Sequence, residues 1–283
     1  MEISRQQARL TLVATLFVVS LGFGIVIPIM PHLARQLGAT PLQVGLITTS
    51  YAAVQFLVAP FWGRLSDRHG RRPILLLGLV GLVLSFGMMA LARSFYSLLA
   101  GRILGGLLSA ATLPTPHAMA ADLSPPHERA RAMGTVGASM GVGFIFGPVI
   151  GGSVASLGVS MPFWTGAAVG FLTLVLALFV LQEPERESVP VRERGNRLDH
   201  LKRSLRSRSA PFFGIMTIVV LGQSTMLSML ALYLADRFGG TSVHAGLAFG
   251  LQGIASVMIQ AVGIGAIVSR LGGARTVLLG VLG

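Results

Sequence analysis

Long apolar segments of similar length follow one another along almost the whole chain, and they constrain its fold more than any other feature. A helix that crosses a bilayer needs about 20 mostly apolar residues. Eight runs of that size lie at Leu10 to Met30, Leu42 to Trp62, Ile74 to Ala92, Tyr96 to Ala121, Met133 to Ser153, Pro162 to Leu181, Pro211 to Leu234 and His244 to Ile264. Backbone polar groups in hydrocarbon must be satisfied within the protein, so the runs predict an all-α, polytopic transmembrane helical bundle.

The residue composition argues against a soluble protein. Hydrophobic residues make up 53% of the 283 residues and charged residues only 11%, a balance that would leave large apolar patches on a soluble domain of this length. The first apolar run is too long for the core of a cleavable signal peptide and lacks a small-residue cleavage site. We therefore expect this run to be the first spanning helix.

A ninth apolar run begins near Ala274 and reaches Gly283, after only about half the length that a spanning helix needs. We expect the chain to be truncated inside this ninth helix. A partly built second bundle would leave helix faces unpaired, so we also expect the chain on its own to be inactive.

The basic residues are distributed unevenly between the loops, and this asymmetry sets the predicted orientation. Of the 22 lysines and arginines, only Arg35, Arg93 and Arg237 fall in loops on one side of the membrane, and Arg102 falls inside a span. Basic loops stay in the cytoplasm, so we expect a multi-pass protein of the cell inner (plasma) membrane with a cytoplasmic N-terminus. The same loops explain the formal net charge of +12, and nucleic acid is not an expected partner.

A change in composition divides the chain into three parts. Residues 183–210 are rich in charges of both signs and form a predicted cytoplasmic linker, with binding of anionic lipid as the alternative role. Residues 1–182 form a predicted N-terminal six-helix bundle. Residues 211–283 form a predicted, incomplete C-terminal bundle of two helices and the start of a third.

A weak internal repeat supports this division. Laying the first two spans over the seventh and eighth aligns Gly63, Arg68 and Gly70 with Gly265, Arg270 and Gly272. Asp67 aligns with Ser269, so the second copy has decayed. Parallel repeats of this kind are typical of transporters whose two halves rock around a central site.

A charged segment, Gly63 to Pro73, separates the second and third apolar runs. We expect a tight loop, because Gly63 and Gly70 permit sharp turns and Pro73 suits the first turn of the following helix. Asp67 stands four residues before Arg71. An acid among four arginines can bind helix ends and partner charges, and so hold one conformation of a two-state protein. The alternative is a loop that only anchors the orientation.

The same segment resembles the loop signature of the major facilitator superfamily. The matching residues are Gly63, Leu65, Asp67, Arg68, Gly70, Arg71 and Arg72. In that family the loop is a conformational latch between the second and third helices, so the resemblance implies a role in gating. Asp122 and Arg129 resemble the charged end of the family's fourth helix and its next loop, and the resemblance places them in the latch as well.

Arg102 lies inside the fourth span, roughly 10 Å from its outer end. A buried guanidinium is costly unless it faces a polar cavity or partner, so it indicates function, with snorkelling to the outer interface as the alternative. Leu98, Arg102 and Gly106 resemble the family's fourth-helix motif, whose arginine is linked to proton coupling, although Gly105 stands where a glutamine is usual. All ten acidic residues lie in loops or at helix ends, so Arg102 has no obvious carboxylate partner within the membrane.

The fifth span carries a glycine every four residues, at Gly143, Gly147 and Gly151. Small residues on one helix face let a neighbouring backbone approach closely, and Pro148 permits a kink. The full set resembles the antiporter motif of the twelve-helix drug:proton antiporter family. Its members here are Gly134, Gly143, Gly147, Pro148, Gly151 and Gly152. The resemblance implies multidrug efflux rather than uptake, and small-residue helix packing alone is the alternative.

Two further polar residues within spans, Gln55 and Gln223, are candidates for a cavity lining. Interhelical hydrogen bonding explains each of them equally well. The sequence contains no cysteine and shows no metal-ligand cluster, phosphate-binding loop or nucleophile with a base. We therefore expect neither an enzyme, nor a metal site, nor a cofactor.

Together these observations predict a proton-coupled secondary active transporter of the major facilitator fold that exports small lipophilic compounds or drugs by alternating access. Its expected partners are a small-molecule substrate, protons and the lipid bilayer, and it is expected to be a monomer. Two alternatives stay open. One is a sugar or metabolite carrier on the same fold, and the other is a non-transporting membrane receptor or scaffold.

Overall fold

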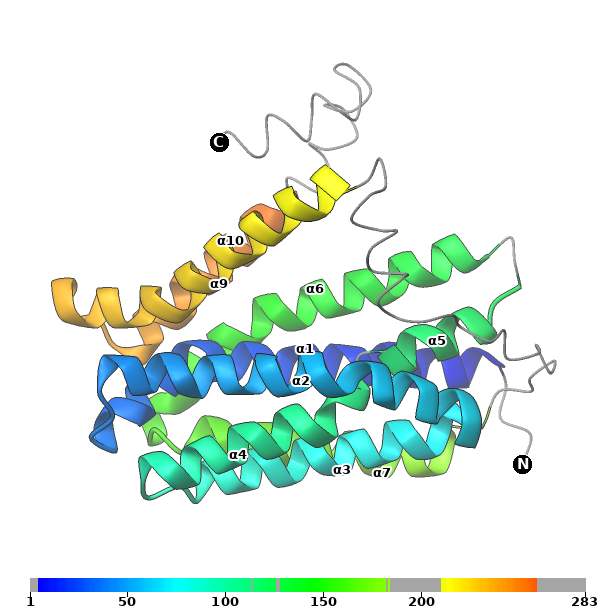
Figure 1. Ribbon diagram of the computed structural model, residues 1–283, viewed down its shortest axis with the longest axis horizontal. Coiled ribbons are helices and arrows are strands. Elements are labelled where there is room, and N and C mark those ends of the chain that lie inside the picture. The colour runs from blue at the N-terminus through cyan, green and yellow to red at the C-terminus, as the bar shows by residue number, and fades with distance from the viewer. Residues whose placement is uncertain (1–4, 113, 126–127, 182, 184–209, 259–283) are drawn as a thin grey trace, which may run out of the picture.

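The computed structural model describes residues 5–112, 114–125, 128–181, 183 and 210–258. The regular elements of these residues are all helices, as the apolar runs predict (Figure 1). The α-helices are α1 (Arg5–Gln36), α2 (Pro41–His69), α3 (Arg71–Ala90), α4 (Phe95–Leu108), α5 (Pro114–Asp122), α6 (Arg129–Val154), α7 (Met161–Val180), α9 (Ala210–Phe238) and α10 (Ser242–Met258). Two short 3-10 helices, η1 (Ser109–Thr112) and η2 (Ala155–Leu157), follow α4 and α6.

Six segments of the described chain are long and apolar enough to cross a membrane. They are Leu10–Gln36, Pro41–His69, Arg71–Ala90, Phe95–Asp122, Ala132–Leu157 and Met161–Val180. Each coincides with one of the first six predicted spans, which confirms the all-α transmembrane bundle. The seventh and eighth predicted spans begin in α9 and α10. Residues 184–209 and 259–283, which hold most of the linker, the end of the eighth span, the ninth run and the second copy of the repeat, lie outside the described residues.

The predicted fourth span is not one uniform helix. It consists of α4, the 3-10 helix η1 and α5. Pro114 has no backbone N–H to donate, and its ring clashes with the carbonyl group four residues earlier in a regular α-helix. The chain therefore tightens into η1 before α5 begins at Pro114, and the fourth span is interrupted near its middle.

Reciprocal capping interactions begin two of the spans at the same end of the bundle. The Thr40 hydroxyl accepts a hydrogen bond from the Gln43 backbone N–H, and the Gln43 side chain accepts one from the Thr40 N–H, at 2.8 Å. Ser94 and Ser97 form the same arrangement at the start of α4. These caps satisfy amide groups that have no partner within the helix, so α2 and α4 start at defined residues.

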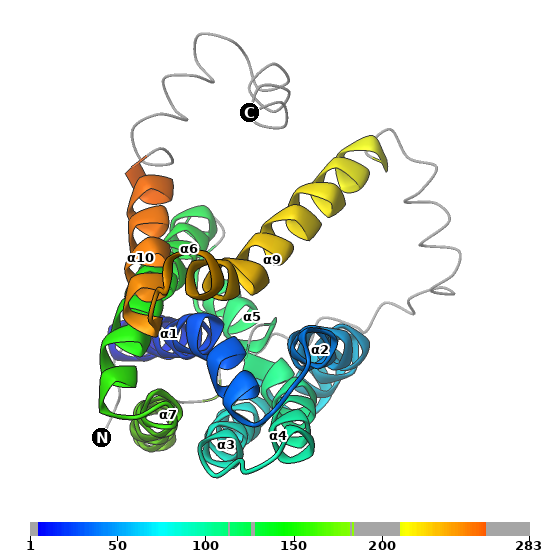
Figure 2. The same ribbon diagram turned by 90° about the vertical axis from the view of Figure 1, so that its left-hand side faces the viewer.

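Helix α1 lies at the centre of the bundle, as the end-on view shows (Figure 2). It packs most extensively on α6, and it also contacts α7 and α9. Leu16, Val19, Ile25 and Ile29 of α1 are fully buried, so this helix supplies much of the core. It continues through Pro28 and Pro31 to Gln36, six residues beyond the predicted end of the first span.

The two ends of the bundle differ. At one end, α1 finishes near Arg35, and α9 and α10 lie against the first six spans; we call it the Arg35 end. At the other, α2 and α3 meet at Gly70; we call it the Gly70 end. Figure 1 shows α9 and α10 close to the bundle at the Arg35 end and diverging from it toward the Gly70 end.

Candidate functional site

The segment Gly63 to Pro73 is not a loop, so that prediction was wrong. Helix α2 continues through His69, and only Gly70 separates it from α3. Gly70 has φ +106°, a backbone conformation that residues with a side chain rarely adopt. Gly63 instead lies inside α2, where an added Cβ would have nothing within 4 Å. One glycine therefore makes the sharp turn, and the charges lie on the adjoining helix ends.

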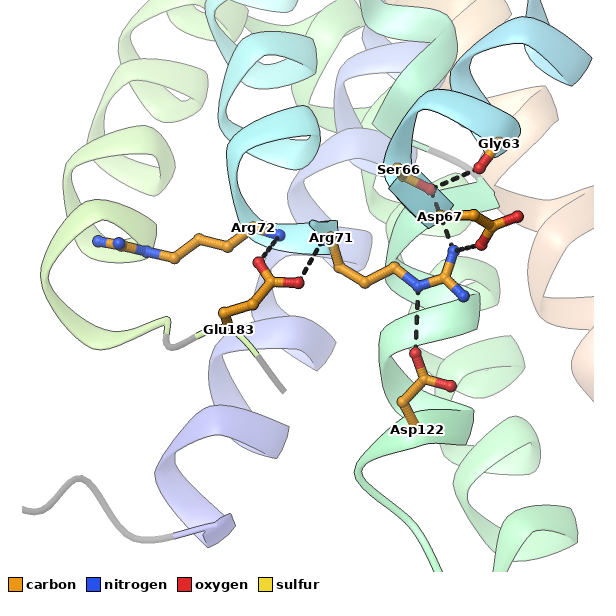
Figure 3. Close-up of polar contacts among 7 residues, drawn as sticks. All are labelled: Gly63, Ser66, Asp67, Arg71, Arg72, Asp122 and Glu183. Carbon is orange, nitrogen blue, oxygen red and sulfur yellow. Dashed lines mark hydrogen bonds and ion pairs between the residues drawn. The ribbon is translucent and has the colours of Figure 1, made fainter. Parts of the chain in front are cut away.

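Arg71 brings together two acidic residues from different helices (Figure 3). Its Nη1 lies 2.6 Å from Oδ1 of Asp67, which stands four residues earlier on the other side of Gly70. Its Nε lies 3.1 Å from Oδ2 of Asp122, at the end of α5. Nη1 also donates to Ser66 Oγ at 3.0 Å. The Arg71 side chain is only 15% exposed, so a single guanidinium joins the ends of α2, α3 and α5.

Glu183, just beyond α7, completes this group, and sequence reasoning missed it (Figure 3). Its carboxylate accepts hydrogen bonds from the backbone N–H groups of Arg71 and Arg72, the latter at 2.8 Å. These are the first two amides of α3, and a carboxylate there satisfies orphan donors and matches the helix dipole. The Arg72 guanidinium donates to the Leu178 carbonyl at 2.7 Å, which ties α3 to α7. We call Asp67, Arg71, Arg72, Asp122 and Glu183 the latch cluster.

The other predicted latch residues lie differently. Arg68 is exposed and stands apart from the ion pairs that the described part of the chain forms. Arg129 is the first residue of α6, but its side chain lies outside the described residues. A usable signal for Glu183 was present, because it is an acid placed directly after the sixth apolar run. It was not recognised because twelve other charged residues of both signs follow it in the linker.

Arg102 lies between α4 and α2 and is only 8% exposed. Its Nε donates to the Ile47 carbonyl at 3.3 Å, and its guanidinium stacks 4.4 Å above the centre of the Tyr51 ring. The Tyr51 hydroxyl in turn lies 2.9 Å from Ser109 Oγ. Snorkelling to the membrane surface is therefore the wrong reading, because α2 holds this side chain inside the bundle. Sequence reasoning did not single out Tyr51, since a tyrosine in an apolar run carries no distinguishing pattern.

Gln55, one of the two predicted cavity residues, belongs to the same group. Its Nε2 lies 3.4 Å from the Tyr51 hydroxyl, one turn away on α2. Gln223 is exposed on α9, and its cavity role stays a prediction. The described carboxylates all lie at helix ends, and none of them contacts Arg102. They are Asp67, Asp122, Glu128, Glu183 and Asp236.

The predicted antiporter motif presents one face of α6 to α1. A Cβ added at Gly143 would lie 2.6 Å from the Phe17 carbonyl oxygen, and one added at Gly147 would lie 2.6 Å from the Leu21 carbonyl oxygen. At Gly151, the Ile25 carbonyl oxygen would be 2.9 Å away. Real Cβ contacts are not this short, so the three glycines are what allows the two backbones to approach.

A second face of α6 meets α10. A Cβ on Gly246 of α10 would overlap the Pro148 carbonyl oxygen, and one on Gly250 would lie 2.5 Å from Val149 Cγ2. The motif residue Gly152 also lies against Gly246. Gly134, by contrast, has nothing within 4 Å of an added Cβ. The structure thus divides the motif into residues packed on α1, residues packed on α10, and one residue packed on neither.

Within the described residues, His, Asp and Glu do not gather into groups of three that could hold a metal ion. The arrangement instead consists of a charged group at the Gly70 end, a buried cation between α2 and α4, and a glycine-lined helix, α6, between α1 and α10.

The sequence matches a model of the Major Facilitator Superfamily over residues 12–283. The chain belongs to this superfamily. Its relatives include Multidrug resistance protein 2 of Bacillus subtilis, which is 32% identical over 95% of this chain and 68% of its own length. The class E tetracycline resistance protein of Escherichia coli is 31% identical over 94% of this chain and 67% of its own length. The quinolone resistance protein NorA of Staphylococcus aureus is 30% identical over 87% and 63%.

Solved structures show the same fold. A bacterial homolog of the human lysosomal transporter Spinster matches with a TM-score of 0.76 at 20% identity, over 97% of this chain and 63% of that one. The human organic anion transporter MFSD10 (TETRAN) matches with a TM-score of 0.68 at 24% identity, over 93% and 72%. The chain is therefore a major facilitator transporter with drug-efflux relatives rather than an enzyme, and it spans about two thirds of the relatives that it matches.

Proposed function

We propose that this protein exports small lipophilic compounds in exchange for protons by alternating access. The observation that carries the proposal is the position of α6. Its motif glycines pack on α1 of the first bundle, and its opposite face packs on α10 of the second. A helix shared in this way is suited to transmit movement between two halves that rock against each other. The resistance functions in the names of the relatives support drugs as the substrate class.

In this proposal residues 1–182 form one half, residues 183–210 the linker, and residues 211–283 part of the other half. The Gly70 end faces the cytoplasm, because the basic residues concentrate there. The protein accordingly lies in the inner (plasma) membrane with its N-terminus inside, and it works as a monomer.

The latch cluster has the properties expected of a conformational latch. It joins the ends of four helices through charge-assisted bonds around a nearly buried guanidinium, and such groups have discrete bonded and unbonded arrangements. Arg68 and Arg129 remain proposed members on the basis of the signature alone. Arg102 is the proposed coupling residue, because a fixed buried cation favours the ionised form of any carboxyl group that approaches it.

Reconstitution into liposomes tests the function. We would express the protein, impose an acid-inside proton gradient and follow accumulation of the cationic dye ethidium. Accumulation should disappear with a protonophore, and Asp67→Asn and Gly147→Leu should abolish it. Gly141→Leu is the matched control on α6, because nothing lies within 4 Å of a Cβ at that position.

Each other result contradicts a defined part of the proposal. Dye accumulation that survives the protonophore would contradict proton coupling. Movement of sugars instead of dye under the same gradient would indicate a metabolite carrier. No solute movement in any arm, with correctly folded protein, would indicate a receptor or scaffold.

A further inference from the structure

An ion pair joins the two halves at the Arg35 end. Arg35 lies in the last turn of α1 and Asp236 in the last turn of α9. Arg35 Nη1 is 2.6 Å from Asp236 Oδ1, and Nη2 is 2.9 Å from Oδ2. Two parallel bonds of this length form the paired geometry in which guanidinium and carboxylate bind best. The two residues belong to different predicted bundles, with the whole charged linker between them in the sequence.

The position of the pair matters for movement. Helix α9 contacts α1 at the Arg35 end and diverges from the bundle toward the Gly70 end (Figure 1). Any opening of the Arg35 end must move the last turns of α1 and α9 apart. Both bonds are shorter than 3 Å, so they break as soon as the turns separate. The latch cluster lies at the opposite end and contains no residue of α9 or α10, so it cannot make this connection.

We propose that Arg35 and Asp236 form an outer gate, which holds the two halves together while the Gly70 end is open and releases when the Arg35 end opens. The assignment of inside and outside rests on the proposed function. The Arg35 and Asp236 side chains are 36% and 62% exposed, so water and salt screen their attraction. A screened pair biases the equilibrium between the two states without locking it, as a carrier that must cycle requires.

The chain supplies a matched control in Arg237. It neighbours Asp236 at the same exposed end of α9, and the internal repeat aligns it with Arg35. Removing Arg237 therefore changes the local charge by the same amount as removing Arg35, without removing the pair.

Distance measurement between spin labels tests the gate without any need for transport. The chain has no cysteine, so Gln36→Cys on α1 and Leu247→Cys on α10 place labels on two exposed positions of the two halves. When the Arg35 end opens, the distance between the two labels should become longer. In lipid nanodiscs, Arg35→Gln should raise the population with this longer distance about two- to five-fold, which corresponds to the loss of one exposed ion pair. Arg237→Gln should leave that population unchanged. The swapped variant Arg35→Asp with Asp236→Arg should restore the original distribution, and high salt should reduce the difference between Arg35→Gln and the parent.

A forced-opening variant separates failure of the gate from failure of the proposed function. Gly246→Leu places a side chain against the Pro148 backbone and should lengthen the distance whatever the ion pair does. If Gly246→Leu lengthens it but Arg35→Gln and Asp236→Asn do not, the halves move and the gate proposal is wrong. An equal effect of Arg237→Gln would also overturn it. If no variant changes the distance, the halves do not rock, and the gate and the alternating-access proposal both fail.

Discussion

Replacing Gly147 by alanine should destabilise the protein, whereas the same replacement at Gly134 should not. Both glycines belong to the motif on α6, and the sequence resemblance gives them equal weight. A Cβ at Gly147 would lie 2.6 Å from the Leu21 carbonyl oxygen and 2.7 Å from Gly24 Cα. These are backbone atoms of α1, so no side-chain rotation can relieve the contact. A Cβ at Gly134 would have nothing within 4 Å.

The magnitude follows from the kind of contact. One methyl group forced into a closely packed interface costs about 1–3 kcal/mol. Replacing glycine by alanine inside a helix contributes up to about 1 kcal/mol in the opposite direction. With the full offset, Gly147→Ala should therefore lose up to about 2 kcal/mol net, and Gly134→Ala should be neutral or slightly stabilised. For a domain of about 150–250 residues each kcal/mol changes the melting temperature by roughly 2–4 °C.

The assay is the thermal transition of the purified variants in one detergent, followed by tryptophan fluorescence. Unfolding of a membrane protein can be irreversible, so all variants need the same scan rate. Gly143→Ala, which meets the Phe17 carbonyl oxygen, should behave like Gly147→Ala. Equal melting temperatures for Gly134→Ala and Gly147→Ala would show that the close approach of α1 and α6 is not what the motif glycines provide.

Substitutions at three further positions test the polar groups. Asp122→Asn should cost about 1 kcal/mol or less, because its ion pair with Arg71 is partly exposed. A double-mutant cycle with Arg71→Gln would measure the coupling between the two residues, and a coupling of zero would contradict the latch cluster. Glu183→Ala should cost about 0.5–2 kcal/mol and speed hydrogen exchange of the first two amides of α3, and Glu183→Gln should have an intermediate effect. Unchanged exchange in Glu183→Ala would show that the Glu183 carboxylate does not cap α3. Tyr51→Phe should cost about 1 kcal/mol through the lost hydroxyl bond. Tyr51→Leu should cost about 2 kcal/mol more, because it also removes the ring beneath Arg102; equal melting temperatures of the two variants would refute the stacking.

The helices and their order could be predicted from the sequence because they depend on local composition. Each of the first six apolar runs became a span, and the turn at Gly70 fell inside the charged segment that the pattern marked. The extent of that turn could not be predicted. Charged residues at a membrane surface are compatible with either a loop or a helix end, and here α2 continues through His69.

The partners of the charged residues could not be predicted, because they come from distant parts of the chain. Glu183 reaches Arg71 across more than a hundred residues of sequence, and Asp236 reaches Arg35 across about twice that separation. Asp67 and Arg71 lie only four residues apart, but Gly70 places them on different helices, so their contact depends on the Gly70 turn rather than on a helical spacing. For the buried Arg102, the sequence showed that a partner was needed but not that the Tyr51 ring supplies it.

The division of the motif on α6 has a consequence for how two halves can move. Against α1, Gly143, Gly147 and Gly151 face backbone carbonyl oxygens and α-carbons, which cannot change rotamer to make room. Against α10, Gly250 and Gly253 meet first the side chains of Val149 and Ile145, which can change rotamer at little cost, and only Gly246 meets first a backbone atom, the Pro148 carbonyl oxygen. In the proposed alternating-access mechanism, we therefore expect movement to concentrate at the surface between α6 and α10, with α1 and α6 moving together. The glycines spaced four apart join α6 closely to α1, which leaves the other face of α6 as the moving surface that the proposed mechanism needs.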